Sequence, residues 1–360
     1  PSASRRGWRR RSVRRGGYSC DCALLGITHF AKGGQGTDPA QRVVGSVALV
    51  YTPMRRGWGT WAALPILMLM GLSAINDNHQ IGQRAEIEPP TMSPQPIELD
   101  LNGWLSQRHA DGRDGDPIYL VALSGGASRS AYWGAYTLAW LEDAQRQAKR
   151  PFMANVYAMS GVSGGSLGAA SLVSFMASDR SLGAPLAQPA YPLAERVTAM
   201  LTRDDMAPAA QAMLYVDLMA RLSPWPLPQL DRSHGLERSW ENDFDQIQNR
   251  QAQTDVSSAD NWFKMPIESL YSADQEQCRQ RVGGARQFGC VALLPRLILN
   301  AASAQTGTPV LQTALDLRHP LAHHMRDAGL GLDHMTLSEA VHNSARFPFL
   351  SPAGRVKKLE

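Results

Sequence analysis

The sequence predicts an α/β fold in which helices cover a mainly parallel sheet, and two observations carry this prediction. A short apolar strand pattern, a glycine-rich turn and a helical pattern follow one another twice within residues 116–180. A further apolar strand and a capped helix come after residue 290. Strands that alternate with helices in this order are typical of parallel sheets, because each helix returns the chain to the same edge of the sheet.

The elements of the first half follow from Asp116 onward. Residues 117–123 (PIYLVAL) have the length and composition of a buried strand, and the spacing of apolar residues predicts a helix over 131–147. A second strand is expected over 155–159 (NVYAM), and a second helix has the sequence LGAASLVSFMA, 167–177. The turns that precede the two helices are SGGASRS and SGVSGGS.

The rest of the predicted domain combines a helical cap with further core elements. Residues 180–265 are rich in Pro, Met and Trp and contain helical patches at 193–201 and 212–222, which favours a cap beside the sheet. Residues 295–302 (PRLILNAA) predict another buried strand, and Thr336 occupies the N-cap position of a following helix.

Charge narrows the possible partners. The 360 residues are 44% hydrophobic and 19% charged, which is ordinary for a globular protein, and the formal net charge is +4. Seven arginines lie within residues 1–15 without an acidic neighbour, so the basic character belongs to this segment and the remainder is net acidic. We therefore expect a solvated basic tail and no nucleic-acid partner.

The four cysteines favour neither a disulfide framework nor a metal site. Cys278 and Cys290 have a spacing that permits one bridge in an oxidising compartment, whereas Cys20 and Cys22 form a C-x-C pair without a matching His/Cys cluster. We expect no metal and no cofactor.

An uncharged stretch predicts a membrane anchor. Residues 58–75 contain no charged side chain, follow Arg55-Arg56 and have the length of a short transmembrane helix, and Trp58 and Trp61 suit an interfacial position. A buried helix of a soluble domain is the alternative, but such a helix normally has a polar stripe. We expect a signal anchor, with the following domain on the side of the membrane opposite Arg55-Arg56.

The expected boundaries follow from these features. Met54, the first methionine, directly precedes the two arginines, so residues 1–53 are interpreted as a basic, disordered or non-native leader and 54–76 as the anchor. The Pro-, Gly- and Asp-rich residues 77–115 are interpreted as a linker, 116–354 as the main domain, and 355–360 as a vector-derived end.

The second glycine turn contains a candidate nucleophile. Ser163 has glycine two residues before and two residues after it, follows the strand and precedes the helix, which is the arrangement of a G-x-S-x-G nucleophile turn. Ser166 fits a second, overlapping frame but falls within the first helical turn, and Ser160 lacks the flanking glycines. We therefore predict Ser163 as the nucleophile.

The first glycine turn offers an oxyanion hole. Gly125, Gly126 and Ala127 present consecutive backbone N–H groups at the end of the neighbouring strand, where they can stabilise a developing oxyanion. Arg129, at the start of the next helix, is expected to support this loop by hydrogen bonds.

These segments resemble a known family. LSGGASRSAYWGAYTLAWL (123–141) resembles the G-G-G-x-R-G oxyanion loop of patatin-like phospholipases, and SGVSGGSLGAA (160–170) resembles their nucleophile elbow. Residues 294–310 and 337–354 are similar to later segments of membrane-associated bacterial members. The resemblance implies a three-layer α/β/α sandwich, a Ser-Asp dyad with Ser163 as nucleophile, lipid or acyl-ester substrates, and a bacterial inner-membrane location.

The sequence departs from the family pattern at three places. Ala127 and Ser130 replace family glycines, which matters little unless Ala127 requires a positive φ. The family aspartate lies in a D-G-G or D-G-A motif after the SARFPF…SPAG segment, and no residue here matches it; Asp111-Gly112 and Asp114-Gly115 precede the first strand. We expect weak turnover without this base.

Three alternatives stay open. VALSGGASRSA approaches the S-G-G-x-D-S pyrophosphate loop of PP-loop ATP-binding proteins, with Ser128 in the place of the aspartate. A membrane-anchored module without turnover is the second. An α/β-hydrolase with a Ser-Asp-His triad is the third, and its candidate residues after Ser163 are His319, His323, His324, His334, His342, Asp316, Asp327 and Asp333.

Overall fold

The computed structural model describes residues 68, 71, 81, 95–148, 150–181, 192–216, 231–252, 261–271, 294–317, 323–324, 335–347, 351 and 353–355. The elements below all belong to one unit of the chain, residues 69–360.

A mixed, mostly parallel sheet carries the candidate site. Its strands are β2 (Tyr119–Leu123), β3 (Val156–Val162), β4 (Arg296–Ala302), β5 (Pro309–Gln312) and β7 (His323–His324), in the order β2-β3-β4-β5-β7. Only the β4–β5 pair is antiparallel. Leu123 is in register with Gly161, and Val162 with Asn300, so β2, β3 and β4 end at the same edge.

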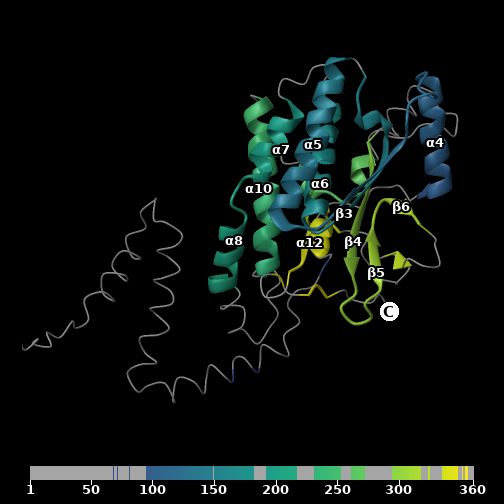
Figure 1. Cartoon of the computed structure of the whole chain (residues 1–360). Helices are drawn as coiled ribbons and strands as arrows, with labels where there is room; N and C mark the ends of the chain where they lie inside the picture. Colours follow the sequence, from purple (N-terminus) through teal and green to yellow (C-terminus); the bar gives the residue numbers. More distant parts are fainter. Residues whose placement is uncertain are drawn as a thin grey trace, which may run out of the picture. The chain divides into compact units, whose positions relative to one another are not determined.

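Helices lie on both faces of this sheet (Figure 1). They are α4 (Ile97–Ala110), α5 (Ala127–Gln147), α6 (Gly164–Ser181), α7 (Leu193–Leu201), α8 (Met206–Gln211), α10 (Arg232–Ala252) and α12 (Leu337–Ala345). Single turns of helix cover Met153–Asn155, Ala212–Val216 and Trp262–Lys264, and a short pair of parallel strands joins β1 (Gln95–Pro96) to β6 (Leu315–Asp316).

The alternation of side chains along β4 separates two apolar clusters. Leu297 and Leu299 belong to the larger one, which is shared with α5, α6, α7, α10 and α12. Ile298 points to the other face, where it packs against the smaller cluster around Trp104 of α4 and Tyr157 of β3. A strand buried on both faces needs apolar residues at consecutive positions, and LIL supplies them.

Buried polar contacts fix α4 on its face of the sheet. Arg296 donates two hydrogen bonds to Asp100 of α4, of 2.9 and 2.6 Å, and the Tyr157 hydroxyl donates a third, of 3.1 Å. Burial and the neighbouring Asp100 carboxylate together raise the pKa of Tyr157 well above its usual value. The folded part of the chain thus includes residues 97–110, which the composition alone had indicated as linker.

The sequence-based elements agree with the structure, with small differences in their ends. The alternating order of strand and helix with a mostly parallel sheet is confirmed, and the helix over 193–201 has the predicted bounds. Thr336 caps α12, with its side chain accepting from the Glu339 N–H and the Glu339 carboxylate accepting from the Thr336 N–H. Helix α6 begins at Gly164, three residues before the predicted 167, because the Ser163 carbonyl already accepts from Ser166 and Leu167.

Several predictions fall on other parts of the chain. Among the described residues no helix has the length and apolar character needed to cross a membrane. The predicted anchor, 58–75, lies outside the described residues apart from Met68 and Gly71, as do residues 1–53 and all four cysteines.

Candidate active site

Ser163 occupies a strained turn between a strand and a helix. Strand β3 ends at Val162 and α6 begins at Gly164, and the single residue between them has a φ of +54°. The left-handed region costs a non-glycine residue about 1–2 kcal/mol. Such strain persists only where the surrounding structure holds it, and it is concentrated at functional sites.

The close approach of the helix explains the glycine two residues before Ser163. A Cβ built on Gly161 would lie 2.7 Å from Cα and 2.8 Å from N of Ser166, closer than real Cβ atoms come to the backbone. The first turn of α6 therefore folds back against the end of β3, and only glycine fits there. The glycine pattern predicted a turn of this kind.

The two glycine turns are in contact, as the parallel order of the strands predicted. A Cβ built on Gly125 would lie 3.3 Å from the Ser163 Cβ, and one built on Gly164 would overlap the Ala127 carbonyl oxygen. The backbone of residues 125–127 thus lies directly beside Ser163. Two segments about 40 residues apart in sequence meet at one edge of the sheet.

The dipoles of two helices favour negative charge at the site. Helices α5 and α6 both begin here, so their first N–H groups have no intrahelical acceptor and their dipoles favour negative charge. Gly125, Gly126 and Ala127 are exposed, and Ser163 is partly exposed. The arrangement suits the binding of an oxyanion next to the serine.

Two features of the first loop differ from the expectation. Ala127 has a φ of +51°, so the alanine does occupy the region that favours glycine. Arg129 is exposed and forms no hydrogen bond or ion pair among the described residues, whereas the Ser130 hydroxyl donates to the Ser124 carbonyl and closes the loop. Ser130 therefore gives the support that was expected from Arg129.

The three serines of the second turn have different surroundings. The Ser160 hydroxyl accepts from Nδ2 of Asn300 at 2.9 Å, and Ser166 is fully buried with its hydroxyl 2.7 Å from that of Ser344. The Ser163 hydroxyl has no hydrogen-bond partner among the described residues and is the only one of the three at a turn with positive φ. Access and geometry both favour Ser163 over its neighbours.

Two residues distant in sequence support the turn, and sequence reasoning missed both. The Ser344 hydroxyl of α12 accepts from the Ser163 N–H at 3.0 Å and donates to the Asn300 carbonyl at 2.6 Å. Asn300, two residues before the end of β4, donates from Nδ2 to the Gly161 carbonyl at 2.8 Å. The only signal available was their placement, since Asn300 lies near the end of a buried strand and Ser344 lies near the end of a capped helix.

The base that would activate Ser163 is not among its described neighbours. No carboxylate or imidazole of the described residues forms a hydrogen bond with the Ser163 hydroxyl. Asp111 and Asp114 follow α4, where Asp114 pairs with His109 at 2.7 Å. Of the triad candidates, Asp316 lies in β6 and His323 and His324 form β7, while His319, Asp327, Asp333 and His334 lie outside the described residues.

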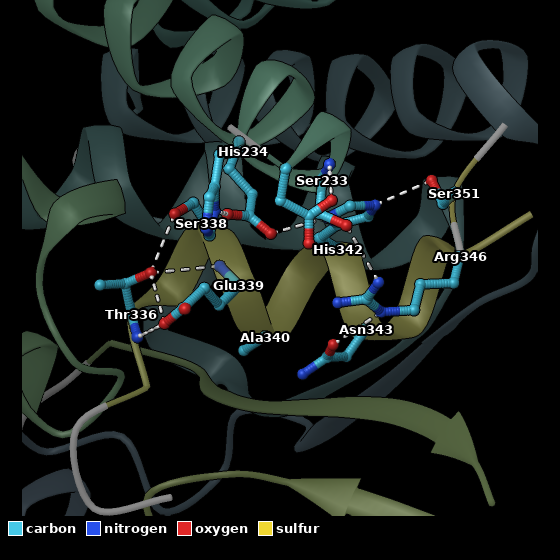
Figure 2. A network of polar contacts seen from close by, with 12 residues as sticks. Ser233, His234, Thr336, Ser338, Glu339, Ala340, His342, Asn343, Arg346 and Ser351 are labelled. Carbon is cyan, nitrogen blue, oxygen red and sulfur yellow. Dashed lines mark hydrogen bonds and ion pairs between the residues drawn. The ribbon is translucent and has the colours of Figure 1, made fainter. Parts of the chain in front are cut away.

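The remaining triad candidate, His342, belongs to a different cluster (Figure 2). Its Nδ1 lies 2.7 Å from Glu237 of α10, and its Nε2 lies 2.8 Å from the Ser351 hydroxyl. His234 contacts the other oxygen of Glu237 at 2.9 Å. A neutral His342 that donates from Nδ1 and accepts at Nε2 satisfies both contacts.

The pKa values in this cluster are shifted by burial and by pairing. Burial opposes the ionisation of Glu237, but hydrogen bonds from His234 and His342 outweigh it and hold the Glu237 pKa well below its usual value. Burial lowers the pKa of His342, and the Glu237 carboxylate opposes this only in part. Glu237 was not a sequence candidate, because helix α10 offers no motif around it.

The described residues contain no candidate metal centre, and comparisons with known proteins found no relative. Within the described ranges no group of three or more His, Cys, Asp or Glu side chains is arranged to hold a metal ion. No protein-family model, curated protein or solved structure matches this chain.

Proposed function

We propose that this protein is a serine ester hydrolase of the patatin-like type, in which Ser163 attacks acyl esters. One observation carries the proposal: Ser163 has a φ of +54° at a strand-to-helix turn, next to a second glycine loop. A serine is held in this unfavourable conformation where its hydroxyl must stand clear of the backbone. The three-layer sandwich and the kinship with patatin-like phospholipases are part of the proposal.

The proposed reaction uses the two loops together. The Ser163 oxygen attacks the carbonyl carbon of the ester, the carbonyl electron pair moves to its oxygen, and the N–H groups of Gly125, Gly126 and Ala127 stabilise the resulting negative charge. The tetrahedral intermediate collapses, the alcohol leaves with the serine proton, and the acyl group remains on Ser163. Water then hydrolyses this ester and regenerates the serine.

The surroundings favour an apolar acyl group as the substrate. Val162, directly before Ser163, is 46% exposed, and its side chain lies beside Gly125 of the first glycine turn. An exposed apolar side chain next to a reactive serine suits an acyl chain better than a phosphate ester. A lipid or other acyl ester, a membrane anchor over 58–75, and a domain on the side opposite Arg55-Arg56 complete the proposal.

An active-site-directed probe tests the nucleophile. A fluorophosphonate probe is expected to label the full chain at Ser163, with phosphorus taking the place of the acyl carbon. Ser163→Ala should abolish labelling, whereas Ser166→Ala should retain it. Intact mass spectrometry and peptide mapping give the stoichiometry and the position.

The same experiment, together with ATP binding, separates the proposal from two of the alternatives. Labelling that survives Ser163→Ala would refute the assignment of the nucleophile. A folded wild-type chain that is never labelled would instead favour the module without turnover, and ATP binding by such a chain would favour the PP-loop protein.

A further inference from the structure

A single hydroxyl joins the nucleophile turn to two distant elements. Ser344 Oγ lies 3.0 Å from the Ser163 N, 2.7 Å from the Ser166 Oγ and 2.6 Å from the Asn300 carbonyl oxygen. Ser344 lies more than 170 residues after Ser166 in the sequence and 44 residues after Asn300. Ser344 is thus the point where α12, β4 and the start of α6 meet.

The hydrogen-bonding capacity of Ser344 is fully used. A hydroxyl has one hydrogen to donate and two lone pairs that accept. The Asn300 carbonyl takes the hydrogen, so the Ser163 N–H and the Ser166 hydroxyl must both donate to the oxygen. No rotation of the hydroxyl can replace one partner without losing another, and this fixes the direction of the Ser163 N–H.

Asn300 holds the other side of the same turn. Its Nδ2 donates to the Gly161 carbonyl at 2.8 Å and to the Ser160 hydroxyl at 2.9 Å. Hydrogen bonds therefore hold the backbone at two points, the Gly161 carbonyl by Asn300 and the Ser163 N–H by Ser344. The φ of Ser163 sets the orientation of the peptide plane that contains its N–H, so this N–H turns away from Ser344 if Ser163 relaxes to an ordinary φ.

We propose that Ser344 and Asn300 are positioning residues that hold Ser163 in its left-handed conformation and so aim its hydroxyl at the bound ester. They touch neither substrate nor the reacting atoms, and they act only through the backbone of the turn. The inference rests on the proposed function of Ser163, because it assigns these residues to the reaction that Ser163 starts.

The test compares the rate of probe labelling with that of a matched variant. Ser344→Ala removes the hydroxyl, and we expect the maximal rate of fluorophosphonate labelling to fall by about 10- to 100-fold, since misplacement of a reacting group by about 1 Å costs this much. The probe concentration that gives half-maximal rate should stay unchanged. Ser344→Thr keeps the hydroxyl and should restore most of the rate, and Asn300→Asp, which exchanges a donor for an acceptor, should slow labelling.

Ser338→Ala is the control. Ser338 lies on the same helix and is fully buried, and its hydroxyl donates to Glu241 at 2.6 Å without touching the turn. Both alanine variants should lower the melting temperature, but only Ser344→Ala should lower the labelling rate of the folded protein. If Ser344→Ala does not fold, Ser344→Cys, whose thiol donates and accepts weakly, takes its place with the same expected result.

The outcomes separate this inference from the proposed function. Labelling that persists in Ser163→Ala overturns both. Labelling that depends on Ser163 but is as fast in Ser344→Ala as in Ser338→Ala overturns the positioning role alone. Slow labelling in Ser344→Ala, with rescue by Ser344→Thr, supports it.

Discussion

Helix α12 contributes to two polar clusters that differ in access and in strain. One cluster is a Ser–His–Glu series of hydrogen bonds like that of a serine hydrolase, formed by Ser351, His342 and Glu237. All three side chains are buried, with exposed fractions of 7%, 0% and 1% in that order. At the nucleophile turn, Ser163 has no such chain among the described residues, but it is partly exposed and has a positive φ.

The comparison teaches that a Ser–His–Glu series of hydrogen bonds does not by itself indicate a site. In the buried cluster each polar group is satisfied by another, and Glu237 divides its two oxygens between His342 and His234, which stabilises the packing of α10 against α12. At the turn the strain is maintained by neighbours and one hydroxyl is left available. We therefore interpret the first cluster as structural and the second as functional.

The largest expected effect is the loss of stability when the buried cluster is broken. Glu237→Ala leaves the ring N–H groups of two buried histidines without their acceptor, and each buried polar group left unpaired costs about 1–3 kcal/mol in the free energy of unfolding. Urea denaturation measures this loss. The folded fraction should still be labelled at the wild-type rate, because Glu237 does not contact the nucleophile turn.

A matched substitution shows whether the loss of stability is specific to a buried carboxylate or follows the removal of any carboxylate. Glu195→Ala removes an exposed carboxylate from α7 and should change the free energy of unfolding by less than about 0.5 kcal/mol. Equal effects of the two substitutions would contradict the structural role. A fully folded Glu237→Ala that is no longer labelled would place the cluster in the active site.

A smaller effect concerns the dependence of stability on pH. The pKa of His342 is lowered in the folded state, so between this value and the ordinary 6.5 the unfolded chain binds the extra proton and stability falls as the pH falls. The pKa of Glu237 is lowered as well, so its contribution is present above its ordinary 4.5 and is lost as the pH falls below it. Both groups therefore make the protein less stable in acid.

Denaturation curves from pH 8 to pH 4 measure this dependence. We expect the denaturant concentration at the unfolding midpoint to decrease as the pH is lowered below about 6.5. This decrease should be weaker in His342→Gln, which has no titrating ring. If the unfolding midpoint changes with pH in the same way in wild type and His342→Gln, this cluster does not titrate as the structure implies.

The sequence predicted the contact between the two turns but could not predict what holds it. Gly161 and Gly165 around Ser163, and the paired glycines at 125 and 126, are local patterns with a mechanical reason, and parallel strand order brings them to one edge of the sheet. Ser344 and Asn300 have no local pattern. Their role depends on the register of β4 and the docking of α12, which are long-range properties.

Two other differences have the same origin. Arg129 was expected to support the first loop because it lies at the start of the next helix, but the rotation of α5 leaves it exposed and turns Ser130 toward the Ser124 carbonyl. Residues 97–110 have the composition of a linker with scattered polar residues. Their helix is stabilised by Trp104 against Tyr157 and by Asp100 with Arg296, and both partners lie far away in sequence.

The smallest expected effect is the change in the free energy of unfolding when the backbone strain in the two turns is relieved. Glycine populates the left-handed region without the Cβ penalty of about 1 kcal/mol, so Ala127→Gly should raise the free energy of unfolding, and Ser163→Gly should be more stable than Ser163→Ala by a similar amount. The control is Ala144→Gly, at an exposed position in the interior of the same helix α5, where glycine should lower stability by about 0.5–1 kcal/mol. Opposite signs at residues 127 and 144 would show that strain, and not helix propensity, sets the result. If Ala127→Gly destabilises the protein as much as Ala144→Gly, residue 127 is not strained, and the φ of +51° no longer supports a loop held in place for an oxyanion.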